Sequence, residues 1–466
     1  MTEPGNDRYT GDSKSSQRGG SSLWQRFCRM IVRIFYRQFE ISGLDRIPAD
    51  NGIILCANHV NALVDAVVLQ ASTVRQIRPL TRSGLFGNPV LRPVLNAIGA
   101  VPIYRRQDSG SDMARNKDSF IKCYEILENN EILIIFPEGQ SHSDPHLHDL
   151  KTGAARIALG AQQHHNRLPV VIPVGLTFSR KGTFRGDVLV QYGEPIDLTI
   201  PENTSHDDRV TLLTHRIHAG LSSVTLNASS WEDIELARRV EKFFALRHGK
   251  YRHGKLQQHF SALQRLIDGQ RLLLAHEPDK VRALISHLRM FERLCNCCGI
   301  RDYHLTLDYR PTLIVIYILR TLGVILIGLP LAIWGMINSA IPYLLTRHLA
   351  TRMARGLDQY DTTKVLLGLL LFTLFWALQI TWVFSQFGGL WMALYAASLF
   401  ISAPVAVALR HEYRTILANL KVFFMFLRKK QLREYLKTRR QDIEAELAHM
   451  VRIAKRLSRT NEVDMQ

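Results

Sequence analysis

The sequence contains few cysteines and no sign of a disulfide framework. Six occur in 466 residues: Cys28, Cys56, Cys123, Cys295, Cys297 and Cys298. Their spacing matches no small secreted domain, which favours reduced thiols in a cytoplasmic protein. The last three lie close together, but no second Cys/His pair at zinc spacing is near them, so we expect no zinc site.

Two other sequence patterns are missing. No Gly-x-Ser-x-Gly elbow occurs, which argues against a serine acyl-enzyme route. Residues 1–22 are polar and rich in Ser and Gly, without an apolar core of signal-peptide length. We expect a disordered polar tail here and no export signal.

Acidic residues are outnumbered by basic ones. The chain has 59 Lys and Arg against 41 Asp and Glu, a formal net charge of +18. This balance favours an acidic partner, either nucleic acid or an anionic membrane surface. Basic residues flank long apolar segments, and neither zinc-finger spacing nor an RNA-binding aromatic signature is present. We therefore expect a lipid bilayer as partner and no nucleic acid.

Short apolar runs alternate with helical patterns between about residues 43 and 197. The expected strands are 52–57, 78–81, 100–104, 132–136, 170–178 and 188–192. The expected helices are 62–72, 88–98, 112–128 and 153–164. This alternation predicts a layered α/β domain over residues 41–202 with a mostly buried mixed sheet.

The first candidate for chemistry is His59, at the turn between strand 52–57 and helix 62–72. Asn61 is a good N-cap for that helix. Residues six apart do not share a helix face, so His59 and Asp65 can meet only if His59 precedes the helix and folds back. Asp65 would then orient the imidazole of His59 as a general base. The alternative is a polar turn residue followed by an aspartate in a first helical turn.

A second candidate follows strand 132–136. Residues 137–142 form a turn that carries the carboxylate of Glu138. Like His59, Glu138 comes directly after an apolar strand, and loops at strand ends build the sites of open α/β sheets. We expect the two residues to belong to one site.

These motifs resemble the signature of a known family. Asn58-His59 with Asp65, followed by Phe-Pro-Glu-Gly at 136–139, is similar to the paired signature of the glycerolipid acyltransferases. That family includes the glycerol-3-phosphate and the 1-acylglycerol-3-phosphate (lysophosphatidic acid) acyltransferases. Three further blocks resemble the family in the same order: 99–105, 168–174 and 192–196.

The spacing of the first motif resembles one branch of that family. Five residues separate His59 from Asp65, where the commonest pattern has four. This longer form, with residues 139–144, is similar to the yeast-type acyltransferases that use glycerol 3-phosphate or dihydroxyacetone phosphate. Residues 231–239 and 298–303 resemble the helical middle region of that branch, so the likeness covers roughly residues 40–310.

The resemblance implies which residues bind the substrates. The acceptor's phosphate needs fixed positive charge, which the planar guanidinium of Arg105 supplies, and the neighbouring Arg106 is the alternative. The acceptor would contact residues of one turn: Pro137, Glu138, Gly139 and Ser141. Pro173 would shape the acyl-donor side, although an ordinary core strand explains it at least as well.

We expect no cofactor and no metal. Possible ligands do gather after Glu138: His142, Asp144, His146, His148 and Asp149. Transfer of an acyl group from a thioester to a hydroxyl needs no metal ion, however, and no helical metalloprotease motif is present. The resemblance implies acyl-CoA as a co-substrate, and it leaves acyl carrier protein open as the alternative acyl donor.

The favoured function is a membrane-bound O-acyltransferase of phospholipid precursor synthesis. It would move a fatty acyl group from acyl-CoA to the hydroxyl of glycerol 3-phosphate. Lysophosphatidic acid and dihydroxyacetone phosphate are alternative acceptors that the shared motifs do not separate. A non-catalytic, lipid-binding membrane scaffold is the alternative of another class.

The flanks of the α/β domain are expected to be helical. Residues 23–40 place Trp and Phe on one helical face and Arg on the other, which favours a basic amphipathic helix at a membrane interface. The pattern of residues 203–310 predicts a charged helical region. Its basic side chains would face either anionic headgroups or solvent.

Membrane helices are expected near the C-terminus. Residues 311–409 form a membrane domain, with a re-entrant hairpin or span at 313–345 and spans at 365–384 and 390–409. The first segment is expected to break near 328–330. Basic loops and the basic helical tail at 410–466 then lie in the cytoplasm, with the catalytic domain, at a bacterial inner membrane or the endoplasmic reticulum.

Overall fold

The structure is a computed structural model. It describes residues 23–89, 91–104, 115–164, 169–179, 181, 183–201, 203–247, 256–301, 304–305, 311–354 and 356–464. The chain forms two compact units, each described by itself. The first contains Met1–Trp231, Lys255–Ser261 and Ala354–Thr362, and the second contains Glu232–Gly254, Ala262–Met353 and Thr363–Gln466.

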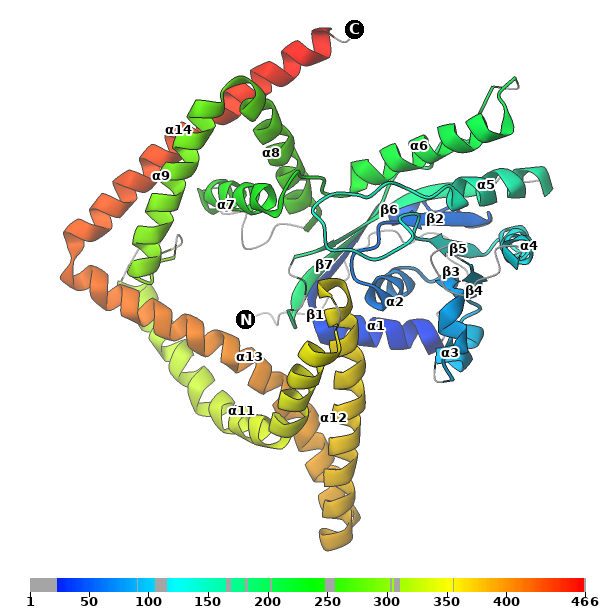
Figure 1. The fold of residues 1–466 in the computed structure, drawn as a ribbon. Helices are drawn as coiled ribbons and strands as arrows, with labels where there is room; N and C mark the ends of the chain where they lie inside the picture. Colours follow the sequence, from blue (N-terminus) through cyan, green and yellow to red (C-terminus); the bar gives the residue numbers. More distant parts are fainter. Residues whose placement is uncertain are drawn as a thin grey trace. The chain divides into compact units, whose positions relative to one another are not determined.

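A seven-stranded mixed sheet forms the centre of the first unit (Figure 1). In spatial order its strands are β1 (Tyr36–Ser42), β7 (Gly186–Tyr192), β6 (Val170–Phe178), β2 (Ile53–Ala57), β5 (Ile132–Ile135), β3 (Ile77–Arg82) and β4 (Val101–Ile103). Neighbouring strands are parallel except β6 and β7, which are antiparallel. This is the expected α/β domain with a mixed sheet. The central strands β2 and β5 are buried along their whole length, as parallel strands covered on both faces are.

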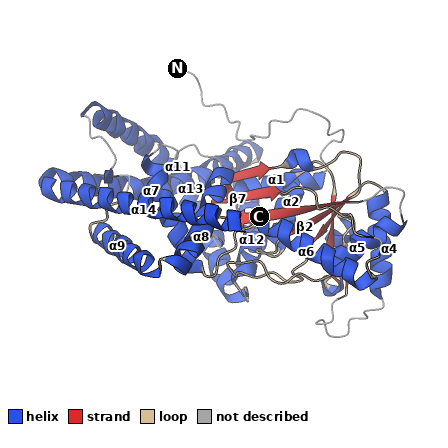
Figure 2. Cartoon of the chain, turned by 90° about the horizontal axis from the view of Figure 1, so that it is seen from above, coloured by secondary structure: helices blue, strands red, loops and turns tan. Residues whose placement is uncertain are grey.

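Helices cover both faces of the sheet, as the blue helices around the red strands of Figure 2 show. In Figure 1, α5 (Gly153–His164) and α6 (His206–Val224) lie above the strands, and α1 (Leu23–Phe35) and α2 (Leu63–Ser72) lie below them. Ile54 and Cys56 of β2 join the core under α4 (Asn116–Glu128), α5 and α6. The intervening residues of β2 point to the other face, because side chains alternate along a strand. The remaining helix, α3 (Leu91–Ala97), precedes β4.

Helix α6 extends the α/β unit beyond the expected boundary at residue 202. Its buried stripe, Val210, Leu213, Ile217 and Leu221, belongs to the same core as β2 and α5. Gly175 of β6 allows the end of α6 to approach closely, since a Cβ there would lie 1.8 Å from the carbonyl oxygen of Val224. The sequence pattern did not assign α6 to this domain, because its polar and charged residues outweigh its apolar stripe in composition.

The expected helix over residues 23–40 is wrong in its second half. Helix α1 ends at Phe35, and residues 36–42 form β1, which pairs in parallel with β7 about 150 residues later. A partner so distant in sequence leaves no local signal. The apolar stripe of α1 remains exposed at Leu23, Phe27, Met30 and Ile34, whereas Gln25, Cys28 and Val32 are buried.

The second unit is helical. Its elements are α7 (Trp231–Arg247), α8 (Leu256–His276), α9 (Pro278–Cys297), α11 (Pro311–Met353), α12 (Leu357–Phe387), α13 (Gly389–Arg428) and α14 (Lys430–Asp464), of which α7, α8 and α12 begin in the first unit. Residues of α7, α9 and α14 share one apolar core. Helices α11 and α13 pack against each other, and Gly335 lies against the backbone of Ser402.

Within the part of the chain that the structure describes, three helices are long and apolar enough to cross a membrane. They comprise Thr321–Met353, Gln359–Phe387 and Gly389–Leu409. The expected break near 328–330 is wrong, because α11 continues through Pro330 and Pro342. A proline removes one backbone donor, and neighbouring groups in a long apolar helix tolerate that loss. Gly388, with φ of 81°, separates α12 from α13 between the two expected spans 365–384 and 390–409.

The packing of α6 on the sheet can be tested by adding one methyl group. We expect Gly175→Ala to lower the free energy of unfolding by about 1–3 kcal/mol, because its Cβ would overlap the Val224 carbonyl oxygen. Gly87→Ala is the control, since nothing lies within 4 Å of a Cβ there. Thermal unfolding of the two purified variants in detergent measures the difference. Equal midpoints would contradict this packing.

Candidate active site

The site begins where β2 ends. Asn58 follows the strand and joins it to β6, since its amide nitrogen donates to the Leu176 carbonyl oxygen at 3.2 Å and its amide oxygen accepts the Leu176 N–H at 2.7 Å. Both bonds are buried, so the chain leaves the sheet in a fixed direction. His59 is the next residue and keeps 20% of its side chain exposed.

His59 and Asp65 meet as expected. The distance from His59 Nδ1 to Asp65 Oδ2 is 2.9 Å, and the same oxygen accepts the N–H groups of Val60 and Asn61 at 2.8 Å. Asp65 lies in the first turn of α2 and is completely buried. A carboxylate only accepts hydrogen bonds, so Nδ1 of His59 donates to Asp65, and in the neutral imidazole Nε2 then presents its lone pair.

The five-residue spacing is accommodated by a strained turn. Ala62, the residue before α2, has φ of 45° and ψ of −125°, a conformation that suits glycine better than alanine. Asn61 was expected to cap the helix, but Ala62 occupies the N-cap position, and the amide of Asn61 donates to Asp361 instead. The sharp turn at Ala62 folds His59 back over the first turn of α2.

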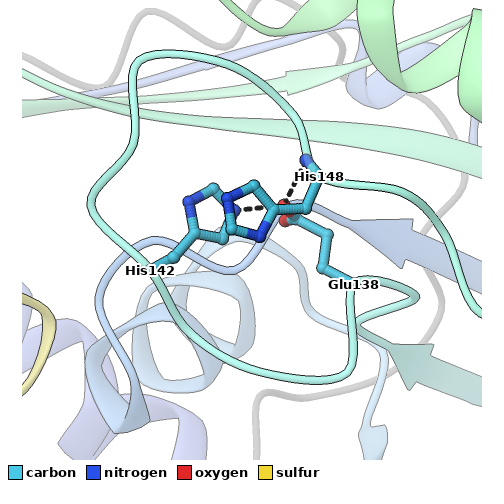
Figure 3. A group of neighbouring side chains, drawn as sticks. All are labelled: Glu138, His142 and His148. Carbon is cyan, nitrogen blue, oxygen red and sulfur yellow. Dashed lines mark hydrogen bonds and ion pairs between the residues drawn. The ribbon is translucent and has the colours of Figure 1, made fainter.

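Glu138 holds the loop of His59 from the neighbouring strand end. Its Oε1 accepts the backbone N–H of His59 at 2.7 Å. Its Oε2 accepts from the ring Nε2 of His142 and from the backbone N–H of His148 at 3.0 Å, and Figure 3 shows these three side chains together. The backbone N–H of His142 also donates to the His59 carbonyl oxygen at 3.1 Å. The turns after β2 and β5 are thus joined at both backbone groups of His59.

The Glu138 carboxylate is buried and charged. Burial raises its pKa. Hydrogen bonds from His142, His59 and His148 together lower the pKa by more than burial raises it, so the pKa lies below its usual value. Glu138 therefore accepts three hydrogen bonds from the protein as an anion. Its expected contact with the acceptor stays a prediction.

Glu138, His142 and His148 place possible metal ligands within 4.8 Å of one another. The rings of the two histidines are stacked, with centroids 3.7 Å apart and planes 3° from parallel. A metal ion lies near the plane of each imidazole that binds it, and two stacked parallel planes share no such point. In addition, the Asp144 N–H donates to Nδ1 of His142, so the ring proton is on Nε2 and faces Glu138. This arrangement fits a hydrogen-bonded support better than a metal centre.

The other residues of the Glu138 turn shape the site. Phe136 stacks on the imidazole of His59 with centroids 4.1 Å apart. Gly139 has φ of 78°, which favours glycine, and its N–H closes the turn onto the Phe136 carbonyl oxygen. The carbonyl oxygen of the buried Pro137 accepts the Lys151 N–H at 2.7 Å, and Ser141 is half-buried beside His142.

Pro173 makes no contact with His59 among the described interactions. Pro173 is buried in β6 opposite Cys56 and faces Gly193 and Gly220, where it fills the core. Its predicted part on the acyl-donor side stays a prediction. Arg105 and the alternative Arg106 lie outside the described residues.

Three supporting contacts were not predicted from the sequence. Phe136 and His142 occur in the motif but were not assigned to His59, and the contact of Asn61 with Asp361 joins residues 300 positions apart. The contacts of Phe136 and His142 could have been suspected from the sequence, because both residues border the Glu138 turn. The third contact has no such signal.

Part of this chain is similar to known acyltransferases. The family model described as Acyltransferase matches residues 38–177. Glycerol-3-phosphate O-acyltransferase 1 of Saccharomyces cerevisiae is 31% identical over 132 residues, which are 26% of this chain and 17% of that protein. Glycerol-3-phosphate O-acyltransferase 2 of the same yeast is 29% identical over 200 residues, 40% of this chain and 25% of that protein.

These matches cover one domain of this chain and only part of each relative. The chain carries an acyltransferase domain at residues 38–177. It matches a quarter or less of the length of the two yeast proteins. The solved 1-acyl-sn-glycerophosphate acyltransferase PlsC of Thermotoga maritima is 20% identical, with a TM-score of 0.32, over 43% of this chain and 77% of that one. That likeness is too weak to bear on the reaction.

The strained turn can be tested at Ala62. We expect Ala62→Val to destabilise the protein by about 1–3 kcal/mol and to lower activity, because a β-branched side chain resists positive φ. Ala62→Gly should keep both stability and activity. Unfolding midpoints and steady-state rates of the two variants measure the effect, and equal behaviour would rule out strain at this position.

The charged state of Glu138 predicts acid sensitivity. Since its pKa is lowered in the folded protein, the carboxylate contributes stability that is present above about pH 4.5 and is lost as the pH falls through the folded pKa. Glu138→Gln should cost about 1–3 kcal/mol at pH 7 and weaken this acid dependence. Denaturant unfolding between pH 7 and pH 3 measures it. Parallel curves for both proteins would contradict the assignment.

Proposed function

We propose that this chain transfers a fatty acyl group from acyl-CoA to the hydroxyl of glycerol 3-phosphate, an early step of phospholipid synthesis. The observation that carries the proposal is the bond from His59 Nδ1 to the buried Asp65, which directs Nε2 as a base. The Acyltransferase family match over the same residues supports it.

The proposed reaction needs one base and no covalent enzyme intermediate. Nε2 of His59 takes the proton of the acceptor hydroxyl as the oxygen attacks the thioester carbonyl carbon. Asp65 stabilises the imidazolium that forms. The tetrahedral intermediate then breaks its carbon–sulfur bond, and the coenzyme A thiolate leaves and takes the proton from His59. The products are the acylated glycerol phosphate and coenzyme A.

The acceptor is proposed from the relatives and from the sequence motifs. Both yeast relatives are named glycerol-3-phosphate O-acyltransferases, which favours glycerol 3-phosphate over lysophosphatidic acid and dihydroxyacetone phosphate. Arg105 would bind the phosphate. We place Pro137, Glu138, Gly139 and Ser141 around the acceptor, with Glu138 acting through the backbone of His59.

A bilayer is the proposed location of the reaction. Three helices among the described residues are apolar and long enough to span it. The exposed stripe of α1, which comprises Leu23, Phe27, Met30 and Ile34, suits its interface. The exposed Arg26 and Arg33 of the same helix suit anionic headgroups. We propose that the acyltransferase domain faces the cytoplasm, where acyl-CoA is present.

The function can be tested with His59→Ala. Purified protein in detergent micelles receives palmitoyl-CoA and radiolabelled glycerol 3-phosphate or lysophosphatidic acid in separate reactions. We expect product from glycerol 3-phosphate, and a loss of about 10²–10⁴-fold in His59→Ala because the general base is gone. His276→Ala removes an exposed histidine at the end of α8 and is the matched control.

The outcomes separate the alternatives. Product from lysophosphatidic acid alone would move the enzyme to the second acylation. Equal, low signal from the wild type and His59→Ala would contradict catalysis with these substrates and favour a membrane scaffold.

A further inference from the structure

The loop between His59 and Asp65 has a contact outside the α/β sequence. The side chain of Asn61 is completely buried, and its Nδ2 donates to Asp361 Oδ2 at 2.9 Å. The Asn61 carbonyl oxygen also accepts from Thr362 Oγ1 at 3.3 Å. Asp361 and Thr362 lie in the first turns of α12, the yellow helix of Figure 1, and belong to the first compact unit.

Asn61 is well placed to transmit this contact. Its backbone N–H donates to Asp65 Oδ2, the oxygen that also binds His59 Nδ1. Its amide oxygen has no donor among the described residues, so the bond to Asp361 is the hydrogen bond that fixes the amide. An acceptor that carries a negative charge makes this bond stronger than a neutral one would.

The strain at Ala62 explains why such a support is needed. Ala62 follows Asn61 and holds a positive φ, which persists only where surrounding contacts fix the backbone. Within the loop, Asp65 binds the N–H groups of Val60 and Asn61. The contacts from Asp361 and Thr362 fix two other groups of Asn61, its side-chain amide and its carbonyl oxygen.

The charges of Asp361 and Asp65 both affect one further side chain, that of Tyr36. Tyr36 is buried at the start of β1, and burial raises the pKa of its hydroxyl. The negative charges of Asp361 and then Asp65 raise this pKa further. Asp361 and Asp65 thus both act on Tyr36.

We propose that Asp361 is a positioning residue for the His59–Asp65 pair and acts through Asn61. This inference rests on the proposed function and deepens it. Asp361 lies near the beginning of the apolar helix α12. The apolar run of α12 begins at Val365, four residues after Asp361. The beginning of a candidate membrane helix therefore completes the catalytic loop, although it is 300 residues away in sequence.

The test uses the full chain in detergent micelles with palmitoyl-CoA and glycerol 3-phosphate. We expect Asp361→Ala to lower kcat about tenfold, with the KM of both substrates changed less than about threefold, because the base is misplaced while substrate contacts remain. Asp361→Asn should keep most of the activity, since its amide oxygen can still accept from Asn61. Asp207→Ala removes an exposed carboxylate from α6 and is the control for lost charge.

A double-mutant cycle separates positioning from general destabilisation. Asn61→Ala should lower kcat about as much as Asp361→Ala, and the double variant should lose no more than either single variant, because one contact is removed in each case. Additive losses would overturn the inference. So would an Asp361→Ala protein that folds less well but keeps the wild-type kcat per folded molecule.

The same experiment distinguishes this inference from the proposed function. If His59→Ala is inactive and Asp361→Ala keeps its kcat, the inference alone is wrong. If His59→Ala has the same rate as the wild type, the proposed function is wrong, and the inference is wrong with it.

Discussion

The site depends on two buried carboxylates that accept hydrogen bonds from the turns around them. Asp65 binds the ring of His59 and the N–H groups of Val60 and Asn61. Glu138 binds the N–H of His59, the ring of His142 and the N–H of His148. A buried carboxylate is costly unless several donors reach it, so each one fixes the backbone that supplies them. His59 is held at its ring by one carboxylate and at its N–H by the other.

Local patterns in the sequence predicted much of this arrangement. Apolar runs gave six strands within two residues of their observed bounds, because fully buried parallel strands are continuous apolar segments. The turn after each central strand was recognisable from its polar residues, which located His59, Asp65 and Glu138. Their mutual contacts follow from topology, since β2 and β5 are parallel neighbours that end at one edge.

Contacts between distant segments could not be predicted in the same way. Strand β1 continues directly from α1 and is defined by its pairing with β7. Helix α6 has a polar composition, and its buried stripe is recognised through its contact with the core of the sheet. The bond of Asn61 to Asp361 depends on where a helix 300 residues later begins, so Asn61 was taken for a cap. In each case tertiary contact outweighed local propensity.

The central claim is that Asp65 makes His59 a base by stabilising its protonated form. The most direct test is the kcat of Asp65→Asn for acyl transfer from palmitoyl-CoA to glycerol 3-phosphate. An amide keeps the size of the side chain and an oxygen that can accept the same bonds, but it lacks the negative charge. The account predicts a fall in kcat of about 10²-fold or more, with little change in KM. A variant that keeps the wild-type kcat would contradict this claim, because His59 would then work without the charge of Asp65.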